Sequence, residues 1–381
     1  MKGACAIVLD CDKAFISYAA LRKRGLNFFQ ETEINSPYDD SDIADWLKKN
    51  SEVLKDKISS IEKKSLFNIQ KVYLQLPWGS CQIKRVQEAV TLGRKKKIAS
   101  GDIASLKKYL ENKFLDWDDY CVHNIIFRYE IEGKYYFTAP LGIAAKKIKA
   151  DAILVLIKDK IYQEVEGIFD NLERNFSGFV LPQVSLFSSV FKKKDKIRAV
   201  VSIDYAKSHL VTIGREEFID NKEFPFGLKQ IIEALAEKFI LPFNLAQEVF
   251  FRYFSFQETP FSKEVTIKKE DGYLNLSIQT LNSFIKDYLK TQVQYIAKDL
   301  EQLASNKDLI VSFIGRLNSK EGFYGFLQSF FPYNLKAPLQ KSILSSSYGC
   351  LRYGLNPFLE NDYKRKTSFL RYILGIYKEY F

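Results

Sequence analysis

Two aspartates stand directly after short apolar runs, at positions where they could act together. Asp10 follows the run 6–9, and Asp204 follows the run 199–203. Paired carboxylates that face each other across a cleft can hold Mg²⁺ through water. Aspartates at strand ends also accept hydrogen bonds within turns, and we favour this second interpretation. The pattern therefore marks Asp10 and Asp204 as candidate site residues without establishing a metal site.

The other residue types that ligate metals or form disulfides are sparse. No Cys-x-x-Cys pair occurs, and the five cysteines are scattered and odd in number. We therefore expect neither a zinc site nor a disulfide framework, and a reducing cytoplasm fits this cysteine usage best. The residues concerned are Cys5, Cys11, Cys81, Cys121, Cys350, His123 and His209.

The chain has 381 residues and a net charge of +11. Such an excess reflects either a lysine-rich composition or an anionic partner, which would be a membrane or a nucleic acid. The basic runs 94–97 and 192–196 are not interleaved with aromatic side chains, as a stacking platform for nucleic acid would be. We interpret both runs as solvated loops.

The elements around the two aspartates occur in two similar halves. Predicted second strands, at 15–19 and 209–213, follow the apolar runs that end at Asp10 and Asp204. Helical periodicity marks 41–63 in the first half and 228–239, 245–254 and 280–303 in the second. Mixed strands and helices in two halves predict a two-lobed α/β fold.

A compact α+β unit interrupts the first half at about 71–160. Alternating apolar residues predict a strand near 69–76, and helical spacing predicts a helix at 103–114. A hairpin around 132–134 and a buried strand at 152–157 complete this unit, and a helix at 162–175 follows it. No apolar stretch approaches the eighteen residues that a membrane span needs, and the first ten residues lack the features of a signal peptide.

The last thirteen residues, 369–381, have the pattern of an amphipathic helix. Its apolar and aromatic side chains fall within one arc of about 160° on a helical wheel. Ser368 can cap the helix, and the basic cluster 364–366 directly precedes it. Packing on the protein's own core is the alternative, but the pattern favours reversible docking on an anionic membrane. The residues expected to contact the membrane are Phe369, Leu370, Arg371, Ile373, Leu374, Ile376, Tyr377, Lys378, Tyr380 and Phe381.

Several segments, taken in order, resemble the FtsA family. His123-Asn-Ile-Ile-Phe-Arg-Tyr-Glu-Ile-Glu-Gly133 and Ala139-Pro-Leu-Gly-Ile143 are similar to the signature of that family's inserted, SHS2-type subdomain. Ile98-Ala-Ser-Gly-Asp-Ile103 resembles the segment before that subdomain's helix, and 342–354 resembles the last core helix. No single motif is very specific, and the resemblance rests on the ordered set, which spans nearly the whole chain.

The resemblance implies an α/β, actin-like fold in which each lobe has two subdomains. It also implies a peripheral protein on the cytoplasmic face of the bacterial inner membrane. Such a protein anchors FtsZ filaments during cell division, assembles with itself into protofilaments and contacts other division proteins through subdomain 1C. The implied subdomains are 1A at 1–70 and 161–196, 1C at 71–160, 2A at 197–227 and 304–355, and 2B at 228–303, followed by a linker at 356–368 and the membrane helix at 369–381.

The nucleotide motifs depart from that family, whose members bind ATP between the lobes. Actin-like folds hold phosphates in two loops beginning Asp-x-Gly, because glycine lets backbone N–H groups approach phosphate. Here Asp12 stands at the glycine position of the first loop, 10–13. The second loop, 204–209, has no glycine. Arg316 stands in place of the second glycine of the family's Gly-Gly pair. Lys13 could offset the extra carboxylate or attract a cation.

The family's Ala-Glu-x-x-Lys motif, which supplies a sugar-side lysine, also lacks that lysine at 246–250. We therefore expect weak or absent binding of ATP and Mg²⁺ and no useful hydrolysis, so the chain is not expected to be an enzyme. The remaining candidates in the cleft are Asp10, Asp12, Lys13, Asp204, Ser208, Gly227 and Gly315.

The expected FtsZ site lies on subdomain 2B, where the family meets an acidic tail with an arginine. The corresponding helix, 286–296, lacks this arginine. Arg252, Lys286 and Lys290 are candidates to substitute for it as point charges.

Three other functions compete with this interpretation. A PilM-like scaffold, which binds a short peptide of a pilus-assembly partner, fits degraded phosphate loops equally well. The 1C signature and the C-terminal helix favour FtsA over it. A sugar-kinase-like phosphotransferase needs intact phosphate loops and a catalytic base, and neither is visible. A nucleic-acid binder rests on charge alone, and such a contact weakens steeply with salt.

Overall fold

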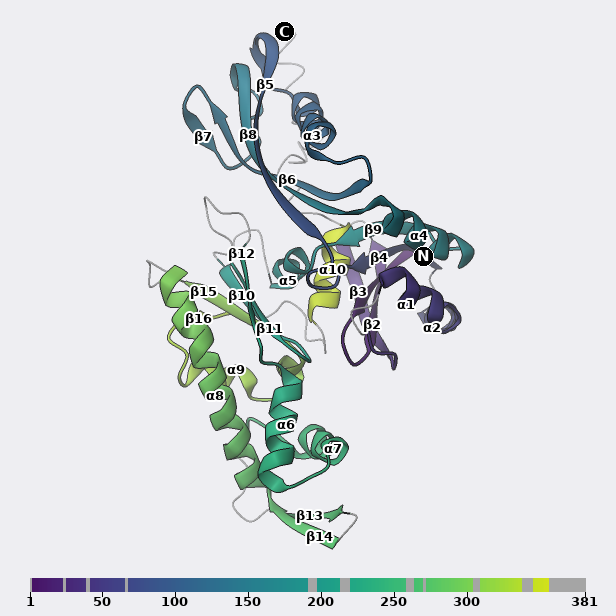
Figure 1. The fold of residues 1–381 in the computed structure, drawn as a ribbon, viewed down its shortest axis with the longest axis vertical. Helices are drawn as coiled ribbons and strands as arrows, with labels where there is room; N and C mark the ends of the chain where they lie inside the picture. Colours follow the sequence, from purple (N-terminus) through teal and green to yellow (C-terminus); the bar gives the residue numbers. More distant parts are fainter. Residues whose placement is uncertain are drawn as a thin grey trace.

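Two five-stranded sheets of the same topology form the centre of the molecule (Figure 1). The computed structural model describes residues 2–22, 25–38, 42–65, 68–190, 197–212, 220–257, 264–269, 272–303, 309–337 and 345–355. In each sheet three antiparallel strands are followed by two strands parallel to the first. The duplication predicted from the two aspartate-ending strands is therefore confirmed at the level of topology.

The strands of the first sheet lie in the order β3-β2-β1-β4-β9, and those of the second in the order β12-β11-β10-β15-β16. Asp10 and Asp204 follow the equivalent strands β1 and β10. The third strand of each sheet, β3 or β12, was not predicted. The bounds are β1 Lys2–Leu9, β2 Ala14–Arg22, β3 Gly25–Ile34, β4 Asn68–Gln75, β9 Phe176–Val180, β10 Ile197–Ile203, β11 Ser208–Thr212, β12 Asp220–Phe224, β15 Ile310–Gly315 and β16 Asn334–Leu335.

Three helices pack on one face of the first sheet, and two of them divide a single predicted helix. They are α1 (Ile43–Lys49), α2 (Ser51–Ser65) and α4 (Asp159–Asn171). The prediction of one helix over 41–63 is wrong at Asn50, because this residue caps α1. Its Nδ2 donates a hydrogen bond to the carbonyl of Trp46 at 2.9 Å.

Two helices, α5 (Pro182–Val190) and α10 (Ser345–Leu355), cross between the lobes. Every residue of α5 is buried, and α10 also covers the other face of the first sheet. The helices approach so closely that a Cβ on Gly349 would lie 1.8 Å from the carbonyl oxygen of Ser185. Arg352 of α10 also donates to the Ser188 carbonyl of α5 at 2.6 Å, and Ser17 Oγ of β2 donates to the Ser347 carbonyl of α10 at 3.0 Å.

A four-stranded sheet in the order β5-β8-β6-β7 is inserted between β4 and α4. Helix α3 packs on one face of this sheet. Strand β4 keeps pairing with β1 and β9 through Gln75, so the insertion begins after Gln75 rather than at residue 71. Its elements are β5 Gln82–Lys97, α3 Ser100–Phe114, β6 Asp119–Ile131, β7 Lys134–Tyr136 and β8 Ala144–Lys158.

The basic run 94–97 lies inside β5 and is not a loop, so that prediction is wrong. Lys96 and Lys97 pair with Ala145 and Ala144 of β8 across the sheet. Side chains at the end of β5 are exposed on both faces, which hides the alternation that marks a strand in sequence. The second basic run, 192–196, lies outside the described residues.

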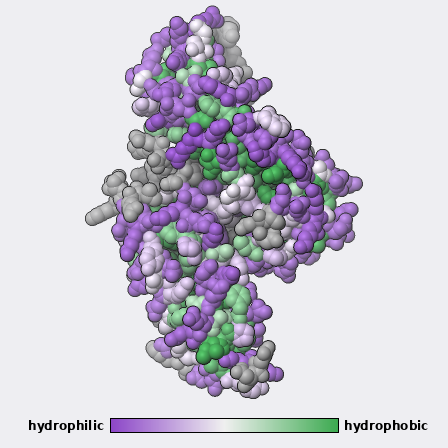
Figure 2. Space-filling model, in the orientation of Figure 1, coloured by the Kyte–Doolittle hydropathy of each residue, from purple (hydrophilic) through white to green (hydrophobic). Residues whose placement is uncertain are grey.

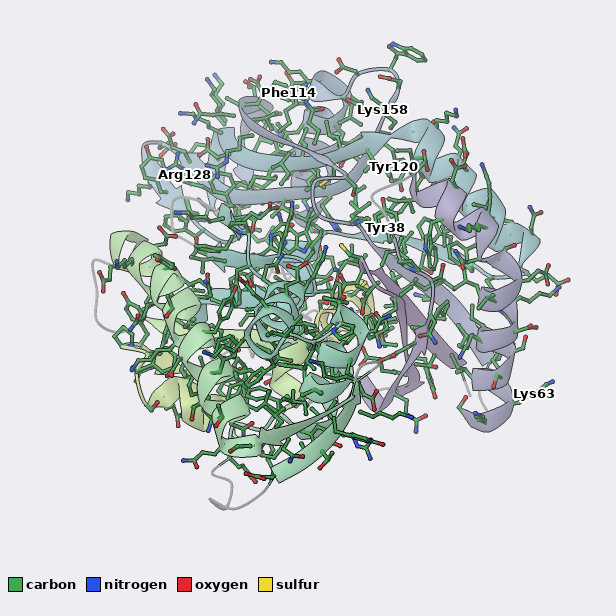
Figure 3. All side chains as sticks on the ribbon, turned by 60° about the horizontal axis from the view of Figure 1, so that its bottom comes forward. Tyr38, Lys63, Phe114, Tyr120, Arg128 and Lys158 are labelled. Carbon is green, nitrogen blue, oxygen red and sulfur yellow. The ribbon has the colours of Figure 1, made fainter. Side chains whose placement is uncertain are left out.

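The insertion is joined firmly to the first lobe. Where the chain leaves the insertion, Lys158 at the end of β8 makes ion pairs within the insertion, with Asp118 at 2.9 Å and Asp119 at 3.1 Å. Tyr120 stacks on Tyr162 of α4 with ring centroids 3.8 Å apart. Figure 3 shows Tyr120 and Lys158 near this junction and Arg128 toward the far end of the same sheet.

The second lobe carries its own helical extension, which forms the opposite end of the molecule from the insertion (Figure 1). A large hydrophobic core joins this extension to one face of the second sheet. Its elements are α6 Leu228–Phe239, α7 Phe243–Tyr253, β13 Glu264–Lys269, β14 Gly272–Ser277 and α8 Ile278–Leu303. A 3₁₀ turn, η1 (Arg316–Ser319), and α9 (Phe323–Gln328) follow β15.

Ile240 ends α6 in a conformation that suits asparagine or glycine better. Its φ is 50°, and its side chain is 80% exposed, at an end of the molecule where Figure 2 shows hydrophobic residues at the surface. The left-handed conformation costs roughly 1–2 kcal/mol for a residue with a Cβ, and less for asparagine. We expect Ile240→Asn to stabilise the second lobe by about 1 kcal/mol in urea denaturation.

Val53→Asn is the matched control, because Val53 is also exposed but lies within the regular helix α2. It should give no such gain. An equal gain from both variants would show that removing an exposed apolar side chain, and not relief of backbone strain, is responsible.

None of the helices in the described residues is long and apolar enough to cross a membrane. The predicted linker, 356–368, and the predicted membrane helix, 369–381, with all of its membrane-contacting residues, lie outside the described part of the chain. Their interpretation stays a prediction.

Candidate functional site

The carboxyl ends of β1 and β10 carry the same tight turn. The backbone N–H of Asp10 donates to the carbonyl of Lys13 at 3.2 Å, and that of Asp204 donates to the carbonyl of Lys207 at 3.1 Å. The two turns meet between the lobes, because Asp10 is close enough to Asp204 for its charge to raise the pKa of that residue, and Arg316 of the second lobe pairs with Asp10 at 2.7 Å. The structure therefore brings the two predicted aspartates to one site.

Arg316, the first residue of η1, enters this cleft from the second lobe. Its Nη2 donates to Asp10 Oδ2 at 2.7 Å, and both of its Nη atoms donate to the carboxylate of Asp12. Its side chain is only 4% exposed. A buried guanidinium thus bridges two carboxylates of the opposite lobe, in a bidentate arrangement that strengthens such pairs.

Gly315 allows the arginine to reach this position. Its φ is 106°, and a Cβ there would lie 2.2 Å from the carbonyl oxygen of Ile203. Strand β15 therefore runs very close to the end of β10, and Arg316, which follows Gly315, is directed toward Asp10 and Asp12.

Aromatic rings from both lobes enclose the guanidinium. The Cζ atom of Arg316 lies 5.3 Å from the ring centroid of Phe15 in β2 and 5.1 Å from that of Tyr205 in the second turn. Cation–π attraction is strongest where the cation is desolvated, as it is here.

The charges at this site interact strongly. Burial alone would lower the pKa of Arg316, but the hydrogen bonds and negative charges of Asp12 and Asp10 outweigh this effect and raise it. Burial raises the pKa of Asp10, and the charge of Arg316 opposes the rise. Burial also raises the pKa of Asp204 to about 7, and the negative charge of Asp10 adds to this shift.

A second contact between the lobes lies beside Asp204. Trp78, which follows β4, stacks on His209 of β11 with ring centroids 3.7 Å apart and an interplanar angle of 8°. Trp78 also hydrogen-bonds Asp204, whose Oδ1 accepts from Ser202 Oγ at 2.6 Å. Burial lowers the pKa of His209 to about 4, so the stacked ring is neutral at pH 7.

The side chains of the remaining predicted cleft residues take no part in the cluster of Asp10, Asp12 and Arg316. Lys13 pairs with Glu33 of β3 at 2.5 Å, so the prediction that it offsets Asp12 is wrong and Arg316 takes that role. Ser208 Oγ donates to the carbonyl of Phe226 at 2.6 Å. Gly227 is the N-cap residue of α6, and a Cβ there would lie 2.6 Å from the carbonyl oxygen of Tyr205.

These residues do not fit a nucleotide phosphate. Asp12 stands where a phosphate loop needs glycine, and its carboxylate is already paired with Arg316. The second turn has no glycine, and Tyr205 lies over the same guanidinium. In the described ranges no group of three or more His, Cys, Asp or Glu side chains is arranged to hold a metal ion.

The three candidates for an FtsZ tail lie apart from this cleft. Arg252, on α7, is paired with Glu248 at 3.6 Å, and Lys286 and Lys290 lie on α8. Lys290 Nζ is 5.9 Å from the ring centroid of Phe330. Nothing in these contacts joins the three into one site, and their role stays a prediction.

Comparison with known proteins supports the fold. No protein-family model and no curated protein matches the sequence. Similar solved structures include the ethanolamine utilization protein EutJ from Carboxydothermus hydrogenoformans, with a TM-score of 0.53, 8% identity and coverage of 92% of this chain and 89% of that chain. A PilM–PilN type IV pilus biogenesis complex has a TM-score of 0.52 and 10% identity, and the match covers 93% of this chain and 99% of that chain. MreB5 of Spiroplasma citri bound to ADP has a TM-score of 0.50 and 8% identity, and the match covers 97% of this chain and 99% of that chain. At such identities the likeness concerns the fold alone, and it confirms the predicted two-lobed, actin-like α/β fold.

Proposed function

We propose that this protein is an actin-like scaffold that works without nucleotide and tethers a partner filament to a membrane. The observation that carries the proposal is the buried ion pair of Arg316 with Asp10 and Asp12, which fills the cleft where this fold binds phosphates. In this proposal the ion pair takes the place of a phosphate, and the protein does not hydrolyse ATP. Its function then rests on its surfaces and on its C-terminal segment.

The partner filament in this proposal is FtsZ, and the site of action is the cytoplasmic face of the bacterial inner membrane. Support comes from the inserted sheet, on which the FtsA-like segments fall. Residues 98–103 lead into α3, 123–131 lie in β6, and 139–143 lead into β8. The insertion would also contact other division proteins and the next subunit of a protofilament.

A PilM-like scaffold is the second candidate, because the likeness to the PilM–PilN complex extends over 93% of this chain. Both candidates are non-enzymatic, and they differ in the partner and in the need for the C-terminal helix. A membrane anchor needs residues 369–381, whereas a peptide-binding scaffold does not.

The tail is the first part to test. We expect the full chain to sediment with vesicles of anionic phospholipid, and a chain ending at Tyr363 to stay in the supernatant. Ile373→Glu should weaken binding at least tenfold, because it places a charge on the apolar face. Gly375→Glu is the matched control, because it adds the same charge on the polar side of the helical wheel.

Equal sedimentation of the full and shortened chains would rule out the anchor. The partner is decided on the same vesicles, by adding FtsZ or a peptide from a pilus-assembly protein. Recruitment of FtsZ filaments only when the full chain is present supports the FtsA-like function. Capture of the pilus peptide by both chains would instead establish the PilM-like function.

A further inference from the structure

The cleft holds three carboxylates and a single guanidinium that bridges two of them. Asp10 and Asp12 belong to the first lobe, and Asp204 and Arg316 belong to the second. The nearby lysines are engaged elsewhere, since Lys13 pairs with Glu33 and Lys207 pairs with Glu223. Among the residues that the structure describes, the charge of Arg316 is therefore the one that offsets the carboxylates at this point.

We propose that Arg316 is a tethered cation that closes the two lobes in place of a nucleotide-bound metal ion. The inference rests on the nucleotide-independent part of the proposed function and adds how closure is achieved. In an actin-like cleft a soluble ligand joins the lobes. Here a side chain of one lobe binds carboxylates of the other, so closure does not depend on ligand concentration.

The contacts fit a guanidinium better than an ammonium. Arg316 presents two Nη atoms to Asp12 and one of them also to Asp10, which a single ammonium cannot reproduce. Its flat group is enclosed by Phe15 of the first lobe and Tyr205 of the second. The stack of Trp78 on His209 adds a second, uncharged contact between the same lobes.

The proposal predicts that removal of the guanidinium exposes a cation site. In Arg316→Ala, Asp10 and Asp12 lose their counterion, and Asp204 lies nearby. We expect this variant to bind one Mn²⁺ per chain, followed by electron paramagnetic resonance, at least tenfold more tightly than the wild type. Asp12→Asn in the same chain should abolish the gain. Small-angle scattering should show a larger radius of gyration for Arg316→Ala, which Mg²⁺ returns toward the wild-type value.

Arg316→Lys separates charge from packing. Because it keeps a cation in the cleft, it should gain little Mn²⁺ binding even if it folds less stably. Arg174→Ala is the matched control: Arg174 is half-buried and pairs with Glu62 at 2.7 Å in the first lobe, away from the cleft. It should lose stability without gaining a cation site.

No gain of Mn²⁺ binding by Arg316→Ala, or the same gain by Arg174→Ala, would overturn the inference and leave the scaffold function standing. Calorimetry with ATP and Mg²⁺ on the wild type tests the proposed function separately from this inference. Micromolar binding of ATP would overturn the nucleotide-independent function. If Arg316→Ala does not fold, Arg316→Gln with the same Mn²⁺ measurement takes its place.

Discussion

Gly349→Ala is expected to destabilise the protein by roughly 3 kcal/mol or more, because overpacking at a rigid backbone contact cannot relax cheaply. The added methyl group would lie 1.8 Å from the carbonyl oxygen of Ser185 and 2.9 Å from the backbone nitrogen of Ser189. Both atoms belong to α5, so α10 and α5 would have to separate. Because both helices cross between the lobes, this separation would also disturb the lobe interface.

Gly167→Ala is the control for this prediction. Gly167 lies on the exposed side of α4, and a Cβ there meets nothing within 4 Å. Alanine in a helix interior is favoured over glycine by about 1 kcal/mol, so this variant should be slightly more stable than the wild type. Urea denaturation of both variants tests the pair. A Gly349→Ala protein as stable as the wild type would mean that the two helices are not in close contact in solution.

Asp204→Asn is expected to stabilise the protein at pH 8 by up to roughly 4 kcal/mol, with little effect at pH 4. Burial raises the pKa of Asp204 to about 7, against 3.8 for the ordinary residue. Between these two values the folded protein holds a proton that the unfolded chain has released. The contribution of Asp204 to stability therefore falls as the pH rises through this window, and it is most unfavourable above pH 7.

His209 has the opposite pH dependence and must be separated from Asp204. Burial lowers its pKa from 6.5 to about 4, so its contribution to stability is lost as the pH falls through this range. Between pH 4 and about 6.5 the two effects oppose each other in the wild type, so thermal denaturation should show little net change in its stability there. The Asp204→Asn variant keeps only the His209 effect, so its stability should rise over the same range. Asp56→Asn, on the exposed side of α2, is the control. Parallel curves for the wild type and Asp204→Asn would contradict the buried position of Asp204.

The sequence predicts most of the helices because their apolar faces repeat at helical spacing. The prediction for 228–239 coincides with α6, and that for 280–303 starts two residues inside α8. Helix α5 was missed for the opposite reason: it is buried on all sides, so no polar face reveals its period. The end of β5 was missed because it is exposed on both sides.

Half of the site follows from local sequence, and half depends on contacts between distant residues. Asp10 and Asp204 can be found because each ends an apolar strand. The pairing of Arg316 with Asp12 joins residues 304 positions apart, and no local pattern encodes it. Lys13 was assigned to the wrong partner because its true partner, Glu33, lies on β3, a strand that the sequence did not reveal. The sequence did contain one signal of this pair: Arg316 stands at a position where glycine was expected, and Asp12 does so in the first loop.

The packing of α10 on the first sheet sets the order in which this protein can fold on the ribosome. Ala4, Ala6 and Tyr73 of that sheet are covered by Cys350, Leu351 and Tyr353, close to the end of the described chain. At about 5–20 residues per second, roughly 20–70 s separate the synthesis of β1 from that of α10. The N-terminal lobe must wait that long with an apolar face uncovered. Nascent chains that include α10 should therefore be the first in which this lobe resists proteolysis, and shorter ones should need a chaperone to stay soluble.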